Sequence, residues 1–261
     1  TYFEGEMAGN AKAARGHSKE KRSDCPLVTL GLVLDGSGFV RRSRMFEGNV
    51  SEAVTLEEML SGLDAPREAM VIMDRGIATE ANIAWLVAHS YRYLVVSREQ
   101  NRQFDESCAV EVPNASGEGI RIQRVINNEG TEVRLYCHSQ QRQEKETAMA
   151  ERFMARFEAG LAKLAAGLDK PRGEKNRDKL QERIGRLKET SHGIARHYKI
   201  ELIPDETGQK VVSLSWGKIP VNGTQLTHPG VYCLRTNEIG WDEATLWHTY
   251  TMLTDLEAVF R

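Results

Sequence analysis

A long helical pattern between two strand-rich segments is the feature that most constrains the fold of this chain. Over residues 140–197, apolar side chains recur every three or four positions, which is the spacing of an amphipathic helix. The first helix is defined by Met149, Phe153, Phe157, Leu161, Leu164 and Leu168. The segment Asp169–Lys175 interrupts the pattern with a proline and a glycine, and Leu180, Ile184 and Leu187 resume it. The spacing therefore predicts a helical hairpin within a mixed chain.

Short strands and short helices alternate before this hairpin, over residues 1–100. The extended run that starts at Val28 meets the turn sequence DGSG at 35–38, and a second extended run follows, which predicts a β-hairpin. Strands are predicted at Ala69–Met73 and Tyr91–Arg98, and helices after Thr55 and Thr79, each a suitable N-cap residue. This order predicts an α/β layer architecture.

The remaining segments are rich in predicted strands. Alternating apolar residues and Gly/Asn turns predict hairpins over residues 101–138. Further strands are predicted at Ile200–Ile203, Val211–Trp216 and Gly230–Arg235, and a final helix from about Asp242 to the end. Both ends of the sequence are read as cut from a longer protein, because Thr1 opens an extended aromatic stretch and Arg261 lies within a helical pattern.

Composition limits the classes of function. Hydrophobic residues make up 40% of the chain and charged residues 28%, which is typical of a globular protein with an apolar core. The net charge is −2, so any basic surface for nucleic acid must be local. The four cysteines form no CxxC pair and are interpreted as reduced cytosolic thiols. Because no apolar run reaches roughly 18 residues, no membrane partner is expected.

Two segments are locally basic. Residues 139–199 contain fifteen Lys and Arg against nine Asp and Glu. A shorter cluster near the start consists of Lys12, Arg15, Lys19, Lys21 and Arg22. Each could be a solvated face or a surface that contacts DNA phosphates, and the sequence leaves both interpretations open.

Two carboxylates stand out by their positions. Asp74 directly follows the apolar run of a predicted strand and precedes Arg75 and Gly76, a position suited either to a turn or to a metal ligand at the edge of a sheet. In the final helix, Tyr250, Leu253 and Glu257 are spaced to share one face. Acidic side chains that converge from different elements could hold divalent cations for phosphoryl transfer.

Several stretches together resemble the catalytic core of DDE-type insertion-sequence transposases, in the group whose core is interrupted by an inserted domain. They are TYFEG, RGHSKEKRSDCPLVTLGLVLDGSGFV, FEGNVSEAVTLEEML, VIMDRGIAT, YLVVSR, GVYCLRTN and YTMLTDLEAVFR. They follow one another in the family order and cover roughly residues 1–98 and 229–261. The middle of the chain matches only loosely.

The resemblance implies an RNase H-like fold with a mixed five-stranded sheet, formed by residues 1–100 and 229–261. An inserted domain over 101–228 would contain strands and the helical hairpin. It also implies an Asp-Asp-Glu triad that binds two Mg²⁺ or Mn²⁺ ions. Asp74 matches the second Asp and Glu257 the Glu, so these are the expected catalytic and metal-binding residues. Lys19, Arg75 and Tyr250 are the expected DNA-binding residues, whereas Leu253 replaces the arginine of the family motif.

The implied activity is metal-dependent cleavage of DNA strands and their transfer to a target. The partners would be transposon-end DNA, target DNA and further copies of the chain, in the cytoplasm of a bacterial or archaeal cell. The family's first Asp would lie upstream of Thr1, so this chain is expected to be inactive. Asp35 and Asp24 are weaker substitutes, because Asp35 lies in a turn sequence and Asp24 in a loop. The alternatives are a non-catalytic DNA-binding remnant and an RNase H-like nuclease, and the helical hairpin could instead be an oligomerisation arm.

Other chemistry-bearing residues have ordinary interpretations beside functional ones. His17 could contact DNA, and Cys137-His138 could bind zinc, although no partner ligands lie nearby in sequence. Trp216, Trp241 and Trp247 could stack on bases or pack in a core.

Overall fold

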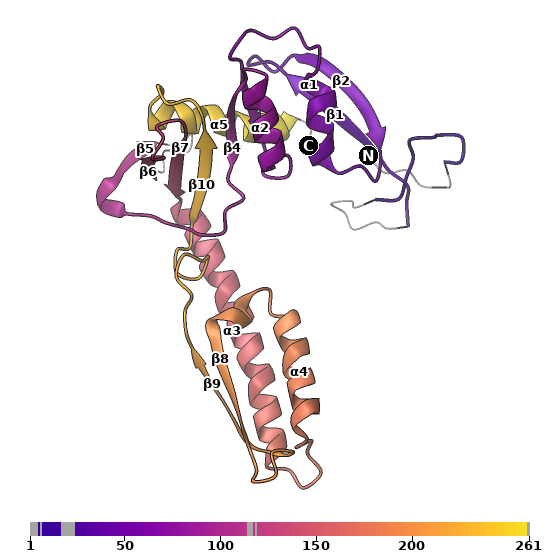
Figure 1. The fold of residues 1–261 in the computed structure, drawn as a ribbon, viewed down its shortest axis with the longest axis vertical. Coiled ribbons are helices and arrows are strands. Elements are labelled where there is room, and N and C mark those ends of the chain that lie inside the picture. Colours follow the sequence, from indigo (N-terminus) through magenta and orange to yellow (C-terminus); the bar gives the residue numbers. More distant parts are fainter. Residues whose placement is uncertain (1–4, 6, 17–23, 114–116, 118, 260–261) are drawn as a thin grey trace. The chain divides into compact units, whose positions relative to one another are not determined.

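The computed structural model describes residues 5, 7–16, 24–113, 117 and 119–259, with side chains up to Leu253 in the final helix (Figure 1). The chain divides into two compact units. The first unit consists of Thr1–Arg98, Arg124–Leu135 and Cys233–Arg261, and the second of Glu99–Gln123 and Tyr136–Tyr232. None of the helices in the described ranges has the length and apolar character required to cross a membrane.

A mixed six-stranded sheet confirms the α/β class. Its strands are ordered β3-β4-β10-β7-β6-β5. They are β3 (Met70–Met73), β4 (Arg92–Val96), β5 (Ala109–Pro113), β6 (Gly119–Ile126), β7 (Val133–His138) and β10 (Val231–Thr236). Strands β3 and β4 are parallel, whereas β4 pairs antiparallel with β10. The prediction of five strands is wrong, because β5, β6 and β7, from the segment predicted to be an insertion, extend this sheet.

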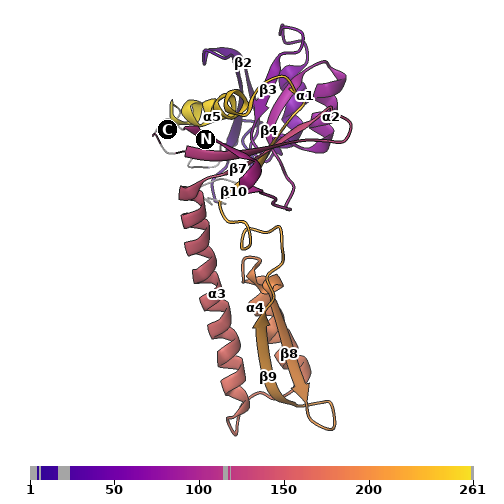
Figure 2. The same ribbon diagram turned by 90° about the vertical axis from the view of Figure 1, so that its left-hand side faces the viewer.

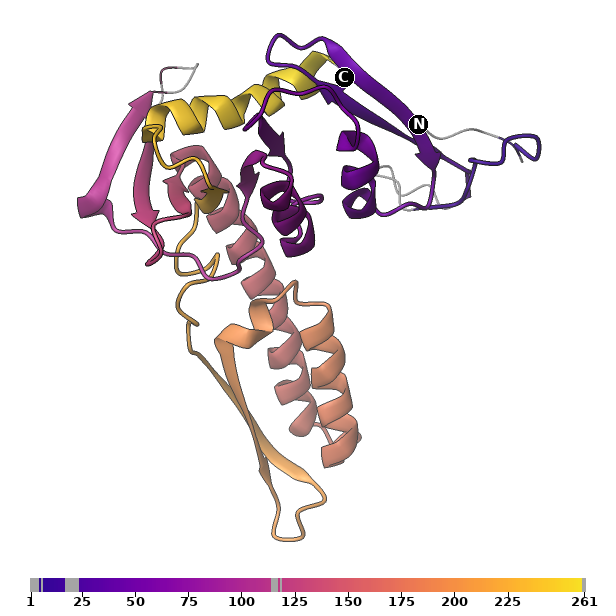
Figure 3. The ribbon, with the colours of Figure 1, turned by 45° about the horizontal axis from the view of Figure 1, so that its top comes forward.

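The core of the first unit lies between the β3–β4 pair and two helices, α1 (Leu56–Leu60) and α2 (Glu80–Ala88). Its buried side chains are Leu56, Leu60, Met73, Ala78, Ile83, Leu86, Tyr93 and Val95. The last helix, α5 (Glu243–Val259), contacts β3 and β4, and Figures 2 and 3 show it on the other side of the strands from α1 and α2. The strand pair is thus covered on both faces, as the short apolar runs of its sequence require.

The two predicted N-caps behave differently. Thr79 caps α2 as predicted, because its Oγ1 accepts a hydrogen bond from the backbone N–H of Asn82 at 3.1 Å. Thr55 precedes α1 but makes no such bond. A short 3₁₀ helix, η1 (Glu52–Thr55), comes directly before α1, and the Thr55 hydroxyl donates to the Glu52 carbonyl at 2.8 Å.

The predicted β-hairpin consists of β1 (Val28–Leu34) and β2 (Val40–Glu47), which form a two-stranded antiparallel sheet of their own. Asp35 closes its turn, since its Oδ1 accepts from the backbone N–H groups of Ser37 and Phe39 at 2.9 and 3.0 Å. From β2, the Arg42 guanidinium donates to three carbonyl groups at the end of α1, which attaches the hairpin to that helix.

The second unit contains the predicted helical hairpin, α3 (Gln140–Leu168) and α4 (Arg177–Glu189). Two shorter 3₁₀ helices, η2 (Glu106–Cys108) and η3 (Ile194–His197), lie elsewhere in the unit. A β-hairpin of β8 (Tyr198–Pro204) and β9 (Val211–Lys218) packs on α3 (Figure 1). The shared core contains Phe157, Leu161, Leu168, Leu180, Ile184, Tyr198, Val211 and Leu214. The apolar stripe of the helices is therefore buried within the unit.

Candidate functional site

Asp74 lies in a tight turn directly after β3. Its Oδ1 accepts the backbone N–H of Gly76 at 2.8 Å, and its carbonyl oxygen accepts the N–H groups of Ile77 and Ala78, both at 3.2 Å. These are the contacts of an Asp that shapes a turn. The Asp74 side chain is nevertheless exposed, and among the described residues its Oδ2 has no partner. The turn and the ligand interpretations of Asp74 are thus compatible.

Two side chains from other elements fix this turn. Beyond the end of β4, Arg98 donates from Nε to the carbonyl of Arg75 at 2.9 Å and from one terminal nitrogen to the carbonyl of Gly76 at 2.7 Å. From α2, the Asn82 amide donates to the carbonyls of Ile77 and Ala53, both at 2.7 Å. Arg98 and Asn82 thus satisfy three backbone carbonyls of the turn, which restricts the positions that Asp74 can take.

A second carboxylate faces the same turn. Glu52 Oε2 lies 2.8 Å from the point where a Cβ would stand on Gly76, and Asp74 Oδ1 lies 4.0 Å from that point. The two carboxylates therefore flank one glycine, although 21 positions separate them in sequence. Within the described ranges, Glu52 forms no ion pair or side-chain hydrogen bond. No sequence pattern indicated Glu52, because only the packing of η1 against the Asp74 turn brings it there.

The donor chemistry at this turn fits a hard divalent cation. Mg²⁺ is commonly held by one or two protein carboxylates together with substrate phosphates and water. Asp74 and Glu52 supply two such groups. The described residues include no cluster of three or more His, Cys, Asp or Glu side chains able to hold a metal. A site for two ions would therefore need further carboxylates.

The other predicted site residues are placed only in part. Glu257 lies in the last turn of α5, and its side chain is outside the described part of the chain. Lys19 and His17 also fall outside the described residues. Tyr250 is half-buried in α5, which contacts β3 and β4. Arg75 is exposed beside Asp74 and donates weakly to the carbonyl of Arg98 at 3.4 Å.

Several alternative candidates have structural partners. Cys25 donates to Asp24 at 3.4 Å. His138 is buried, with Nδ1 at 3.1 Å from Arg121 and Nε2 at 2.6 Å from Gln143. All four cysteines are free thiols.

The three tryptophans that could have stacked on bases differ in exposure. Trp247 is buried, Trp216 packs against the core of the second unit, and Trp241 is the most exposed of the three at 38%. Among them, Trp241 alone presents a substantial surface to a partner.

A buried charge network holds β4 and β10 together in the first unit. Arg235 donates to Glu132 at 2.8 and 3.1 Å, and the Tyr93 hydroxyl donates to the same carboxylate at 2.7 Å. Burial raises the pKa of Glu132, but the bonds from Arg235 and Tyr93 outweigh it and leave that pKa below its ordinary value. Burial and Glu132 raise the pKa of Tyr93. Arg235 also pairs with Glu80, whose side chain is 72% exposed.

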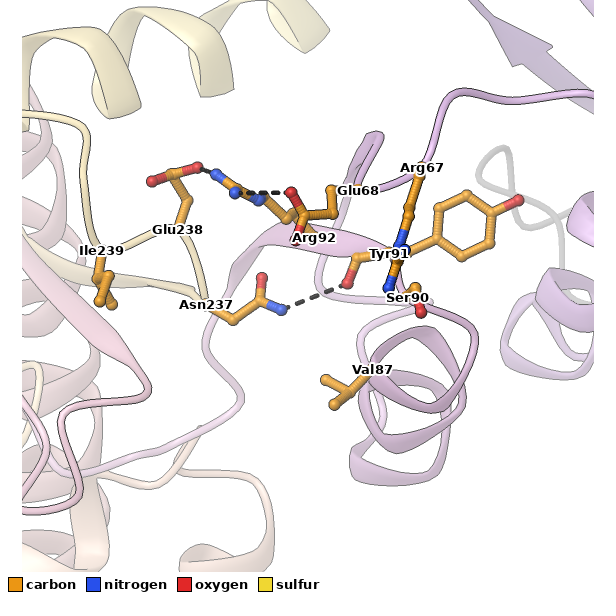
Figure 4. A pocket seen from close by; sticks show the side chains of 9 residues that line it. All are labelled: Arg67, Glu68, Val87, Ser90, Tyr91, Arg92, Asn237, Glu238 and Ile239. Atoms are coloured by element: carbon orange, nitrogen blue, oxygen red, sulfur yellow. Dashed lines mark hydrogen bonds and ion pairs between the residues drawn. The ribbon is translucent and has the colours of Figure 1, made fainter.

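A polar pocket of about 270 Å³ lies at the opposite end of the same strands (Figure 4). Its wall includes Arg67 and Glu68, which precede β3, and Tyr91 and Arg92 at the start of β4. Arg92 forms ion pairs with Glu68 and with the buried Glu238. Asp74 follows β3, so this pocket and the Asp74 turn are at different ends of the β3–β4 pair. The charges of the pocket largely pair with one another.

Comparison of the chain with models of protein families and with curated proteins gave no match. The assignment of function therefore rests on the residues and their geometry.

Proposed function

We propose that this chain is the core of a DNA transposase that cleaves DNA strands and joins them to a target with the help of divalent cations. The observation that carries the proposal is the Asp74 turn. It presents an open carboxylate at the carboxyl end of a parallel strand, where sites in α/β sheets gather, and two arginines and a second carboxylate surround it.

The arrangement of the first unit supports an RNase H-like fold as part of this proposal. Its features are the parallel pair β3–β4 connected through α2, a preceding antiparallel hairpin, and α5 across the same two strands. In the sequence, Glu257 follows the fully buried Leu246 by eleven residues, a helical spacing that would put the two residues on one face. The Asp-Asp-Glu triad of this proposal needs a further Asp besides Asp74.

In this function, Asp74 and Glu257 would hold the cations, with Glu52 as a further carboxylate at the same turn. A bound divalent cation supplies positive charge that stabilises the attacking and leaving oxygens of a phosphodiester. A water molecule would attack the phosphorus at the transposon end. A P–O bond forms to the water oxygen, the P–O3′ bond breaks, and the 3′-oxygen gains a proton. The released 3′-hydroxyl would then attack a target phosphodiester in the same way, while Arg75 orients the strand.

Binding of Mn²⁺ to the chain tests the metal part of this proposal, with electron paramagnetic resonance as the readout. Asp74→Asn should abolish the bound signal. Asp35→Asn is the matched control, because Asp35 also follows a strand and closes a turn through its Oδ1. Unchanged Mn²⁺ binding in Asp74→Asn would contradict the proposal.

A second candidate is a DNA-binding module without catalysis, and one observation in the second unit favours it. The connection between α3 and α4 is joined to the β8–β9 turn, since the N–H of Arg177 donates to Gln209 and the N–H of Val211 to Lys175. This brings Lys175, Arg177 and Lys210 together at one tip, which also carries the acidic Glu174 and Asp205. Such a module would bind DNA in a salt-dependent way and would not cleave it under any metal condition.

A further inference from the structure

Hydrogen bonds from two arginines connect the segments that follow β3 and β4, beside Asp74. Arg98 donates to the carbonyls of Arg75 and Gly76, and Arg75 donates back to the carbonyl of Arg98 at 3.4 Å. Both strands are parallel, with Met73 opposite Val95, so the segments that follow them leave the sheet at the same edge. The reciprocal contacts place each guanidinium group against the backbone of the other segment, so both groups lie at the same edge of the sheet.

Neither of these guanidinium groups is neutralised by a carboxylate within the described ranges. Other arginines of the first unit do have such partners, for example Arg44 with Glu58 and Arg92 with Glu68. Arg98 is exposed and uses two of its five N–H donors on carbonyl oxygens, and the other three have no partner among the described residues. Two positive charges at one edge of the sheet, neither in an ion pair among the described residues, attract an anion.

We propose that Arg75 and Arg98 together bind one phosphodiester of a DNA strand beside Asp74. This inference rests on the proposed function and adds Arg98 to its DNA-binding residues. The guanidinium forks match the oxygens of a phosphate, and the carboxylates of Asp74 and Glu52 lie on the Gly76 side of the same turn. A phosphate and a divalent cation can thus occupy neighbouring positions at one turn. Arg98 also has a positioning role, because it fixes the turn that carries Asp74.

The test measures binding of a fluorescein-labelled DNA duplex to the whole chain by anisotropy, in EDTA and over a range of KCl concentrations. The absence of metal separates this test from the metal-dependent chemistry of the proposed function. Arg75→Gln should weaken binding by about fivefold to tenfold, to the same extent on two unrelated sequences, because a phosphate contact does not read bases. The slope of log K against log salt should become less negative by about 0.9.

The double variant R75Q/R98Q distinguishes one shared phosphate from two separate ones. If both arginines bind the same phosphate, the slope of the double variant should equal that of Arg75→Gln. Two independent contacts would change the slope by about 1.8 instead. Arg98→Lys should bind more weakly than the unchanged chain, because an ammonium group cannot donate to two carbonyls and a phosphate in the same planar geometry.

Arg67→Gln is the matched control. Arg67 lies before β3, whereas Arg75 lies after it. Like Arg75, Arg67 is exposed and has no ion-pair partner within the described ranges. Its removal should leave affinity and slope unchanged. Equal effects of Arg67→Gln and Arg75→Gln, or unchanged binding in Arg75→Gln, would overturn the shared phosphate site. Arg75→Gln is informative even if Arg98 variants fold poorly, since the Arg75 side chain makes only one weak contact with the described residues. If the arginine variants leave DNA affinity and its salt slope unchanged, the shared phosphate site is wrong, but Mn²⁺ can still bind at Asp74. The two proposals can therefore fail separately.

Discussion

Two carboxylates that share Arg235 should contribute very differently to the stability of the first unit. Glu132 is buried and accepts from Arg235 and Tyr93, whereas the side chain of Glu80 is 72% exposed and pairs with the same guanidinium. Loss of one partner in a buried ion pair leaves a charge without compensation, which costs about 3 to 5 kcal/mol. Because Glu80 still pairs with Arg235, we expect Glu132→Gln to cost about 3 kcal/mol. Glu80→Gln should cost less than about 1 kcal/mol.

Urea denaturation followed by tryptophan fluorescence measures this difference. The chain has four tryptophans, and Trp216 is the one that lies in the second unit. In a Trp216→Phe background, the remaining tryptophans report on the first unit alone. A loss of about 3 kcal/mol corresponds to a fall in the urea midpoint of about 1 to 3 M. Equal midpoints for Glu132→Gln and Glu80→Gln would refute the reasoning, because burial would then not decide the cost.

The dependence on pH gives an independent check of the same residue. The pKa of Glu132 is lowered in the folded state, so the unfolded chain binds this proton more readily. The stabilisation is complete above the unfolded pKa of a glutamate, about 4.3, and is lost as the pH falls through the folded pKa. The stabilities of the unchanged chain and of Glu132→Gln should therefore approach each other in acid and differ most near neutral pH. A constant difference from pH 7 to pH 3 would contradict this assignment.

Three further changes test other parts of the structure. Gly230 has φ +80°, and a Cβ there would lie 2.7 Å from the carbonyl oxygen of Ser139, so Gly230→Ala should destabilise the second unit by about 1 to 3 kcal/mol in thermal unfolding. Burial, and then the charge of Arg196, lower the pKa of His197, so the second unit should lose stability as the pH falls below about 6.5. In urea titrations at pH 7.5 and 5.5, His197→Gln should reduce the difference in stability between the two pH values. An unchanged difference would exclude His197 as the source of this pH dependence. Asn82→Ala removes two hydrogen bonds of 2.7 Å to backbone carbonyls, so it should cost about 1 to 2 kcal/mol of stability and weaken Mn²⁺ binding. Unaltered Mn²⁺ affinity would show that the Asp74 turn does not depend on these two bonds.

Local sequence signals predicted most elements of the fold. The three- to four-residue spacing of apolar positions located α3 and α4, and the turn sequence at Asp35 located the β1–β2 hairpin. These signals are local, because a helix period or a turn depends on residues a few positions apart. The six-stranded sheet was not predicted, since the addition of β5, β6 and β7 depends on pairings between distant segments.

The candidate site was predicted only as far as local signals reach. Asp74 was found because it directly follows an apolar strand, and its place in a turn agrees with either interpretation of the sequence. Glu52 and Arg98 were missed as site residues. Each reaches the turn from another element, Glu52 from η1 and Arg98 from the segment after β4, and no spacing rule links them to Asp74. Packing of separate elements, not periodicity, creates that surface.

Cleavage of duplex DNA by the full-length product of the source gene is the most direct test of the proposed role of Asp74. With Mg²⁺ or Mn²⁺ present, we expect nicking at a transposon end that releases a 3′-hydroxyl and then joins it to target DNA. Asp74→Asn should abolish both steps, and Asp35→Asn should retain them. Cleavage that survives in Asp74→Asn, or DNA binding without cleavage under every metal condition, would contradict the role of Asp74 as a metal ligand for phosphoryl transfer.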